Sequence, residues 1–438
     1  MLNSHYYFAK YPLLFCLLLS SCASGQQINN SAAPTISSNL VSTPQPLQST
    51  TSTIVESSSI TSTATPEYQE LEDIVFSPCL SINPAYPDKD EIPWVLLILQ
   101  GDIPYVIDPN TGERTDQFLS NDTSPYATDF SISPNGEWLT YARYGKNDIS
   151  FIVEPSQNIL ANSTQERIIW HLSESVSLGG WINNEAVMLV KNHSLENFGS
   201  TLIYNPFSKE QHEFVLQDLP NYLSYQLGMS GSYLMDHGNL IPDPTLKRVV
   251  YPAWPATDLQ LVLWDAQNKR ELVSLPYTLS QLSRDPFWSQ DGSDFLIAAT
   301  QEQVVEWYRV SKDGDIHKLT HFGEFLKDAE FNLPSRSWDG RYLAFQLLYN
   351  SRKNSKYLLL DLSPQSAEGF CIDLGGEDSG SLHSPVWSPD NRYIAITNGV
   401  YSKNITDVIL VDVESRETFH IAHDEYAPIF AIGWIPKP

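Results

Sequence analysis

From residue 93 onward, short apolar runs alternate with tight-turn signals along the chain. Four segments share one pattern, in which an apolar or arginine position and a Ser precede a turn and the turn leads into an apolar run. They are Ile132–Tyr141, Trp288–Ile297, Arg336–Phe345 and Trp387–Ile396. Gly or Asn at the turn tolerates a positive φ, so each segment predicts two neighbouring antiparallel strands joined by a tight turn.

The pattern repeats at a regular spacing. Weaker copies begin at Trp181 and Leu240, and a last copy begins at Trp434. The seven starting positions are separated by 49, 59, 48, 48, 51 and 47 residues. A period near fifty residues built from strand-turn-strand units is typical of a β-propeller. The longest interval contains extra residues around Asn221–Gly238, which we expect to form a loop over one face.

A second signature follows within most repeats, where an apolar strand ends in Asp or Asn before another turn. Its copies are Tyr105–Gly112, Leu202–Ser208, Leu261–Asn268, Leu358–Leu362 and Val408–Val413. The two signatures together predict four strands for each repeat, which is one propeller blade.

The two ends of the repeat region complement each other. The last copy supplies only an inner strand, Pro428–Ile435, whereas the first repeat begins at Pro93–Gln100 without one. We therefore expect the C-terminal strand to complete the first blade and to close a ring of seven. The predicted fold class is all-β, a seven-bladed propeller of four-stranded antiparallel blades. A pair of β-sandwiches with intervening helices is the alternative, but no helical periodicity of useful length is visible.

The residues before the repeats divide into three segments. Residues 1–21 have the character of an export signal, with Lys10, an apolar run and small residues before the cleavage position. Residues 22–68 are dominated by Ser, Thr, Pro and other small or polar residues, which predicts a disordered tether. Residues 69–92 form a lead-in to the propeller, which covers 93–438.

The end of the export signal, Leu19-Ser20-Ser21-Cys22, resembles the bacterial lipobox. The resemblance implies that Cys22 carries diacylglycerol and becomes the acylated N-terminus after cleavage. Two or three acyl chains anchor a protein stably to a membrane. An ordinary secretory signal with an incidental cysteine is the alternative. We expect a lipid-anchored protein of the cell envelope that faces the extracytoplasmic side.

The charge balance restricts the partners. The chain contains 52 acidic and 26 basic residues, so its formal net charge is −26. Such a surface repels phosphate backbones, and nucleic acid is not an expected partner. The same charge favours solubility outside a cell.

Two cysteines remain in the expected mature domain once Cys16 is cleaved off and Cys22 is lipidated. They are Cys79 in the lead-in and Cys371 in a late repeat. An exported protein retains disulfides, so a Cys79–Cys371 bridge that pins the lead-in to the ring is possible, as are two buried free thiols.

The repeat itself resembles that of the TolB-like propellers, which is clearest at Trp387–Ile396. This repeat also occurs in the propellers of prolyl-oligopeptidase-type enzymes. The resemblance covers residues 93–438 and implies the fold together with protein or small-ligand binding, but no reaction.

A search for catalytic chemistry finds no complete motif. The nucleophile elbow Gly-x-Ser-x-Gly has only a partial match at Gly228–Ser232, which lacks the final Gly, and we expect Ser230 to be a loop residue. No metal, dinucleotide or phosphate-binding motif is present, and we expect no cofactor, no catalytic residue and no hydrolase domain beside the propeller.

Two weaker constellations remain. Loops that lead into inner strands carry His321, His383 and His423, and His423 is followed by Asp424 and Glu425. If these side chains converged at the channel mouth, they could bind a ligand or a metal, and polar loop residues on different sides of the ring are the alternative. The acidic residues Asp88, Asp90 and Glu91 predict a solvated turn or, alternatively, a calcium contact.

The expected function is that of a non-catalytic protein-interaction or ligand-binding module. The alternative is a carbohydrate-active or other hydrolytic propeller with its site at the mouth of the central channel. The hydrolytic alternative requires clustered carboxylates in the channel, beside aromatic platforms. A purely structural envelope protein is a third reading.

Overall fold

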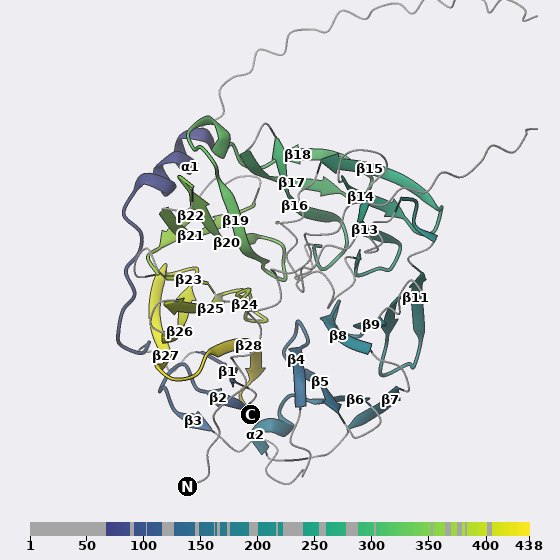
Figure 1. Cartoon of the computed structure of the whole chain (residues 1–438). Coiled ribbons are helices and arrows are strands. Elements are labelled where there is room, and N and C mark those ends of the chain that lie inside the picture. Colours follow the sequence, from purple (N-terminus) through teal and green to yellow (C-terminus); the bar gives the residue numbers. More distant parts are fainter. Residues whose placement is uncertain are drawn as a thin grey trace, which may run out of the picture. The chain divides into compact units, whose positions relative to one another are not determined.

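The computed structural model describes residues 67–87, 92–101, 103–115, 127–144, 149–161, 163, 167–172, 176–191, 200–215, 218–221, 240–253, 260–276, 288–301, 304–351, 354–363, 369–374, 379–381, 383–400 and 405–438. Within these ranges, 28 strands form seven antiparallel sheets around a central axis (Figure 1). The predicted seven-bladed all-β propeller is thereby confirmed. The predicted signal segment, Cys22, nearly all of the tether, the acidic residues at 88, 90 and 91, and Ser230 lie outside the described residues.

The first blade is built from both ends of the propeller. Its sheet has the order β28-β1-β2-β3, with β28 (Ile429–Pro436) innermost, followed by β1 (Trp94–Gln100), β2 (Ile103–Ile107) and β3 (Arg114–Thr115). Strands β1 and β28 pair antiparallel, with Trp94 opposite Pro436 and Leu96 opposite Trp434. The predicted closure of the ring by a shared blade is therefore confirmed.

Blades 2 to 4 follow in chain order, each with its first strand innermost. Blade 2 contains β4 (Ala127–Ile132), β5 (Trp138–Tyr144), β6 (Ile149–Pro155) and β7 (Ile168–Leu172), with the short helix α2 (Asn158–Ala161) before β7. Blade 3 contains β8 (Val176–Trp181), β9 (Val187–Lys191), β10 (Ser200–Tyr204) and β11 (Gln211–Val215). Blade 4 contains β12 (Ile241–Pro242), β13 (Arg248–Ala253), β14 (Gln260–Asp265) and β15 (Arg270–Pro276).

Blades 5 to 7 complete the ring. Blade 5 contains β16 (Asp294–Gln301), β17 (Val304–Ser311) and β18 (Ile316–Lys318), and the 3-10 helix η4 (Phe322–Glu324) follows it. Its inner position is held by a single bridge between Trp288 and Phe295. Blade 6 contains β19 (Glu330–Arg336), β20 (Tyr342–Tyr349), β21 (Asn354–Asp361) and β22 (Gly369–Ile372). Blade 7 contains β23 (Ser379–Ser381), β24 (Val386–Trp387), β25 (Tyr393–Val400), β26 (Ile405–Asp412) and β27 (Glu417–Asp424).

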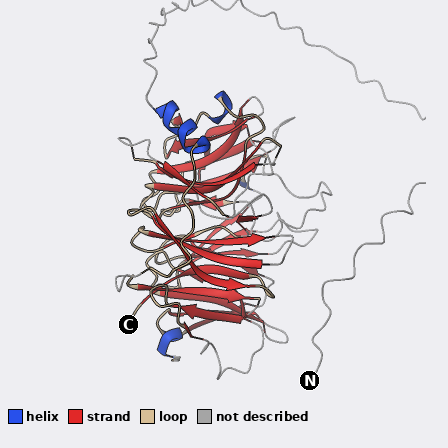
Figure 2. Ribbon diagram, turned by 90° about the vertical axis from the view of Figure 1, so that its left-hand side faces the viewer, coloured by secondary structure: helices blue, strands red, loops and turns tan. Residues whose placement is uncertain are grey.

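The core lies between the blades, because both faces of the middle strands are buried. Along β26, Val408 and Leu410 pack towards blade 1, whereas Ile409 and Val411 pack towards blade 6. Successive side chains of a strand point to opposite faces, so a strand covered on both sides reads as a continuous apolar run. Figure 2 shows the strands of successive blades stacked in this way, seen from the side.

A helix and an extended segment cross the outer edges of the blades. The helix α1 (Glu67–Phe76) packs its Leu71 and Val75 into the core and contacts β22. We call the extended residues after it, 77–87, the rim strap. The strap runs parallel to the outer strands of two blades, with bridges from Leu80 to Ile372 and from Asn83 to Phe419. Figure 1 shows it passing from β22 along β27 towards β3.

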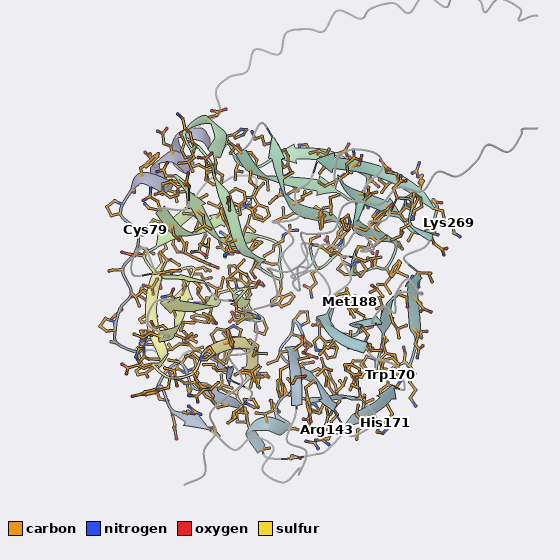
Figure 3. The ribbon with its side chains drawn as sticks, viewed as in Figure 1. Cys79, Arg143, Trp170, His171, Met188 and Lys269 are labelled. Carbon is orange, nitrogen blue, oxygen red and sulfur yellow. A yellow bond between two sulfur atoms is a disulfide. The ribbon has the colours of Figure 1, made fainter. Side chains whose placement is uncertain are left out.

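A disulfide joins the strap to the ring. Cys79 and Cys371 are bonded, with their Cα atoms 4.7 Å apart and a sequence separation of 292. Figure 3 labels Cys79 at the outer side of the ring. This is the pairing that the sequence left open beside two free thiols, and it covalently fixes the beginning of the strap to blade 6.

Two details differ from the sequence-based expectations. The third copy of the repeat, in blade 4, begins at Pro242 rather than Leu240, because Asp243 occupies the turn position that Ser289 holds in the next blade. The helix α1 was not predicted, and its start at Glu67 lies within the last two residues assigned to the tether. Within the described ranges, neither α1 nor any other helix is long and apolar enough to cross a membrane.

Candidate functional site

The turns between the inner strand and the second strand of each blade follow one hydrogen-bonding scheme. In blade 7, the Ser388 hydroxyl donates to the Asp390 carboxylate and accepts the backbone N–H of Tyr393 at 2.9 Å. The Ser388 N–H donates to the carbonyl of Tyr393 at 2.8 Å, and Asn391 takes the left-handed conformation with φ of 61°. The side chains that the repeat shares therefore close a compact polar turn.

The other blades use the same scheme with substitutions. Blades 2, 5 and 6 place a serine hydroxyl against an Asn or Asp two residues later; these serines are Ser133, Ser289 and Ser337. In blade 4, Asp243 accepts the backbone N–H groups of Lys247 and Arg248 through its own carboxylate. In blade 3, Asn183 Oδ1 accepts the backbone N–H groups of Glu185 and Ala186. The weaker copies thus preserve the turn by different donors and acceptors.

Hydrogen bonds link these turns from blade to blade. We call the linked turns, with the chain ends that meet in blade 1, the inner-turn collar; it consists of residues 133–137, 182–186, 243–247, 289–293, 337–341, 388–392, 93–94 and 436–437. The bonds between its members are Trp94 Nε1 to Asp390, Asn135 N to Asn184 Oδ1, Asn183 Nδ2 to the Pro244 carbonyl, and Asp339 N to Asn391 Oδ1. Beside the collar, Arg336 of blade 6 bonds to Asp294 of blade 5. A collar bonded in this way is held rigid from several sides.

Glycine permits the closest approach in the collar. A Cβ at Gly136 would lie 2.9 Å from the carbonyl oxygen of Trp434 and 3.1 Å from the Pro389 ring, and φ at this position is 76°. The turn of blade 2 therefore reaches residues of blades 1 and 7 only because no side chain stands in the way.

Beneath the collar, tryptophan side chains form hydrogen bonds between the inner parts of neighbouring blades. The indole N–H groups of Trp181, Trp288 and Trp434 each donate to a backbone carbonyl of the preceding blade, those of Ser131, Ile241 and Val386. In blade 6, Arg336 occupies the tryptophan position, and Trp338 two residues later donates instead to the carbonyl of Trp387 in the following blade. The tryptophan at this position of three repeats thus bonds its blade to the preceding one.

The collar surrounds a cavity of about 230 Å³ at this end of the central channel. Residues of all seven blades contribute to its wall. Representative lining residues, one from each blade, are Trp434, Pro134, Gly180, Pro242, Gln290, Trp338 and His383. Among the described residues that line the cavity there is no Asp, Glu, Lys or Cys.

The charged and titratable groups of the wall are few. The Arg336 side chain is only 4% exposed, and its NH1 lies 2.5 Å from Asp294 Oδ1, while Nε and NH2 donate to the carbonyl of Gly340. His383 is exposed, with Nδ1 3.0 Å from the carbonyl oxygen of Ser384. The Trp387 indole N–H is buried and has no acceptor among the described residues. The wall therefore combines aromatic and prolyl surface with one unused donor.

The three histidines predicted at the channel mouth have different surroundings. His383 lines the cavity. His321 precedes η4 in the connection from blade 5 to blade 6. His423 lies at the end of the outer strand β27, where Nδ1 is 2.6 Å from Asp407 Oδ1. The structure does not bring His321 or His383 into a ligand group with His423.

The two acidic residues predicted beside His423 also separate in role. Asp424 accepts the backbone N–H groups of Tyr426 and Ala427 and a hydrogen bond from Gln100. Glu425 Oε1 lies 3.5 Å from His423 Nε2. Asp424 therefore shapes the connection into β28, whereas Glu425 remains beside the imidazole.

Sequence reasoning missed the two partners of His423. Asp407 Oδ1 also lies 2.7 Å from His420 Nε2, and donor atoms of Asp407, His420 and His423 all lie within 4.8 Å of one another. Burial alone would raise the pKa of Asp407, but hydrogen bonds from both imidazoles hold it below its ordinary value. The hydrogen bond with Asp407 raises the pKa of His423. The spacing His-x-x-His was visible, but in a regular strand it places the two rings on opposite faces.

Comparison with known proteins finds similarity at the level of the fold. No family model matches the chain, and no curated protein matches its sequence. Similar solved structures include TolB from Acinetobacter baumannii, with 13% identity and a TM-score of 0.42 over 79% of this chain and 84% of that one. The β-propeller domain of the Trilobed protease from Pyrococcus furiosus has 13% identity and a TM-score of 0.44 over 74% and 88% of the two chains. A putative 6-phosphogluconolactonase from Bacteroides fragilis has 11% identity and a TM-score of 0.43 over 80% and 99%.

Proposed function

We propose that this chain is a lipid-anchored, extracytoplasmic β-propeller that binds a protein or small-ligand partner at the inner-turn collar and catalyses no reaction. The observation that carries the proposal is the composition of the collar cavity. Its described lining offers aromatic, prolyl, hydroxyl and backbone groups together with Gln290, Arg336 and His383, but no carboxylate, thiol or lysine amine.

The hydrolytic alternative needs groups that this lining lacks. Glycoside hydrolysis uses a pair of carboxylates across the scissile bond. A hydroxyl nucleophile needs a neighbouring base that is itself oriented by a third group. The lining hydroxyls of Ser133 and Ser337 already take part in turn hydrogen bonds, and the described lining contains no Asp or Glu. These features support binding over catalysis.

The size and rigidity of the cavity indicate what it would accept. Pockets for drug-sized ligands measure about 300–1,000 Å³, so a cavity of about 230 Å³ suits a projecting side chain or a small ligand. The bonds of the collar hold this shape before binding, which lowers the entropic cost of association.

Site-specific photo-crosslinking in intact cells tests the binding site. A photoreactive amino acid replaces Gln290, which is exposed in the collar cavity, or Glu210, which is exposed at the outer rim in the β10–β11 turn. We expect a discrete adduct from position 290 and none from position 210. Equal adducts from both positions, or an adduct from position 210 alone, would contradict the proposed site.

Fractionation tests the anchor. Replacement of the predicted lipid-bearing cysteine, Cys22→Ala, is expected to release the protein from the membrane fraction. The matched control is Cys16→Ala, which alters a cysteine inside the segment predicted to be cleaved and should leave the protein in the membrane. Retention of the Cys22→Ala variant in membranes would overturn the anchor.

A further inference from the structure

A β-bulge in blade 7 brings two histidines onto one carboxylate. Strand β27 pairs with β26 so that His423 lies opposite Asp407 and His420 lies opposite Ile409, with a register shift between Val408 and Ile409. The extra residue of a bulge re-aims the side chains around it. Both imidazoles therefore reach Asp407 although they stand three residues apart.

The three side chains present a compact set of donor atoms. Asp407 Oδ1 lies 2.7 Å from His420 Nε2 and 2.6 Å from His423 Nδ1. Asp407 and His420 are half-buried, whereas the His423 side chain is 43% exposed. The group is thus held by the sheet on one side and open to solvent on the other.

Neighbouring groups support both imidazoles. Glu425 Oε1 lies 3.5 Å from His423 Nε2, the ring nitrogen that does not face Asp407. A carboxylate on the outer nitrogen of a metal-binding histidine selects the tautomer and orients the ring. The backbone N–H of His420 donates to the carbonyl of Asn83 in the rim strap at 3.0 Å, so the strap fixes the strand that carries both histidines.

We propose that Asp407, His420 and His423 form a binding site for a divalent transition metal of the zinc class. Two imidazole nitrogens and one carboxylate oxygen suit zinc, whereas calcium and magnesium prefer oxygen ligands alone. Three protein ligands leave a fourth position for water, as in open zinc sites. This site is independent of the inner-turn collar and of any partner bound there.

The distances require only a small adjustment for metal binding. Zinc binds nitrogen and carboxylate oxygen at about 2.0–2.2 Å, which places neighbouring tetrahedral ligands about 3.3 Å apart. The present contacts are hydrogen bonds that are shorter than this separation. Both contacts with Asp407 must therefore lengthen by about 0.6–0.7 Å, which small rotations of the three side chains supply.

Calorimetric titration with zinc chloride tests the site. The full-length protein, without a histidine tag and stripped with a chelator, is expected to bind one zinc ion per chain. The double variant His420→Gln, His423→Gln should lose this isotherm, whereas His317→Gln, which alters an exposed histidine of β18 outside the group and outside the collar, should bind as the unmodified chain does. Glu425→Gln is expected to weaken binding by about 10- to 100-fold, since it removes the outer carboxylate.

Cobalt provides a second readout of the same ligands. Visible absorption bands of bound Co²⁺ should appear with the unmodified chain and disappear with the double variant. Circular dichroism and thermal melting in chelator establish that the variants fold like the unmodified chain. The proposal is overturned if the unmodified chain binds no zinc, or if the double variant binds it with the same stoichiometry and affinity.

Discussion

The inner and outer edges of the ring are held together by different means. At the inner edge, similar turns recur in successive blades. Tryptophan residues of several repeats also donate a hydrogen bond to the preceding blade. At the outer edge, one strap crosses blades 6 and 7, and a disulfide near its beginning joins it to β22. The comparison teaches that the inner edge closes through many distributed contacts, whereas the outer edge depends on a single non-repeating segment.

The largest expected effect lies at the inner edge, where the ring closes. Trp434 is 1% exposed, packs into the core between blades 7 and 1, and donates to the Val386 carbonyl at 3.0 Å. We expect Trp434→Ala to lower the free energy of unfolding by about 3–5 kcal/mol, measured by urea denaturation. Trp434→Phe retains an aromatic ring and should lose less. If Trp434→Ala costs less than loss of the disulfide, the inner edge is not the principal closure.

The next effect concerns the strap. Cys79→Ser removes a crosslink that spans 292 residues, and we expect a loss of about 2–4 kcal/mol in the free energy of unfolding. Cys371→Ser removes the same bond and should have a similar effect. Reductant should shift the unmodified chain towards the variants while leaving the variants themselves unchanged. A variant as stable as the unmodified chain would show that the strap is held without its disulfide.

An ion pair beside an outer turn gives an effect that depends on pH. Asp412 is buried, and its Oδ2 accepts from Arg392 at 2.9 Å while Oδ1 accepts the N–H groups of Glu414 and Ser415. Burial alone would raise its pKa, but the Arg392 contact and these bonds hold the pKa below its ordinary value. The pair therefore stabilises the folded state at pH values above the unfolded pKa of about 3.9, and this stability is lost as pH falls through the lower folded pKa.

Asp412→Asn removes the negative charge of that side chain and keeps its shape. Asn205 already makes the corresponding backbone contacts in blade 3, so asparagine should keep the turn and lose only the ion pair. We expect a loss of about 2 kcal/mol at pH 7 in urea denaturation. The difference from the unmodified chain should shrink as the solution is acidified below about pH 4. A difference that is constant with pH would mean that the carboxylate charge contributes nothing.

The smallest effect concerns a strained turn at the outer edge. Lys269, labelled in Figure 3, is exposed in the β14–β15 turn with φ of 50°, a conformation that Gly112 supplies without strain in the corresponding turn of blade 1. Relief of strain should exceed the entropic cost of glycine, so Lys269→Gly is expected to stabilise by about 0.5 kcal/mol. Lys269→Ala keeps the strain and should bring no gain in thermal denaturation. A destabilised Lys269→Gly variant would contradict this interpretation.

The inner edge is the part that the sequence predicts best. Turn residues such as Ser388, Asp390 and Asn391 act within one short segment, so local spacing reveals both the turn and the count of blades. The weakest repeat was aligned two residues early because Asp243 replaces the usual serine. Strand pairing in the shared blade followed from the incomplete repeats at the two ends.

The outer edge and the metal-binding group could not be predicted in the same way. The helix α1 has only 10 residues, and its two core residues, Leu71 and Val75, are too few to establish a helical period. The group around Asp407 depends on a bulge between β26 and β27, which no residue type signals. The sequence therefore identified His423 as a candidate but placed it with the wrong neighbours, His321 and His383.

Hydrogen exchange in the Cys79→Ser variant tests the central distinction between the two edges most directly. The backbone N–H groups of Asp373 and His420 donate to carbonyls of the strap, whereas those of Ser337 and Ser388 donate within collar turns. Under conditions where the variant stays folded, we predict that peptides containing the first pair lose protection and that peptides containing the second pair keep it. Loss of protection in the collar as well would contradict the claim that the inner edge closes the ring without the strap.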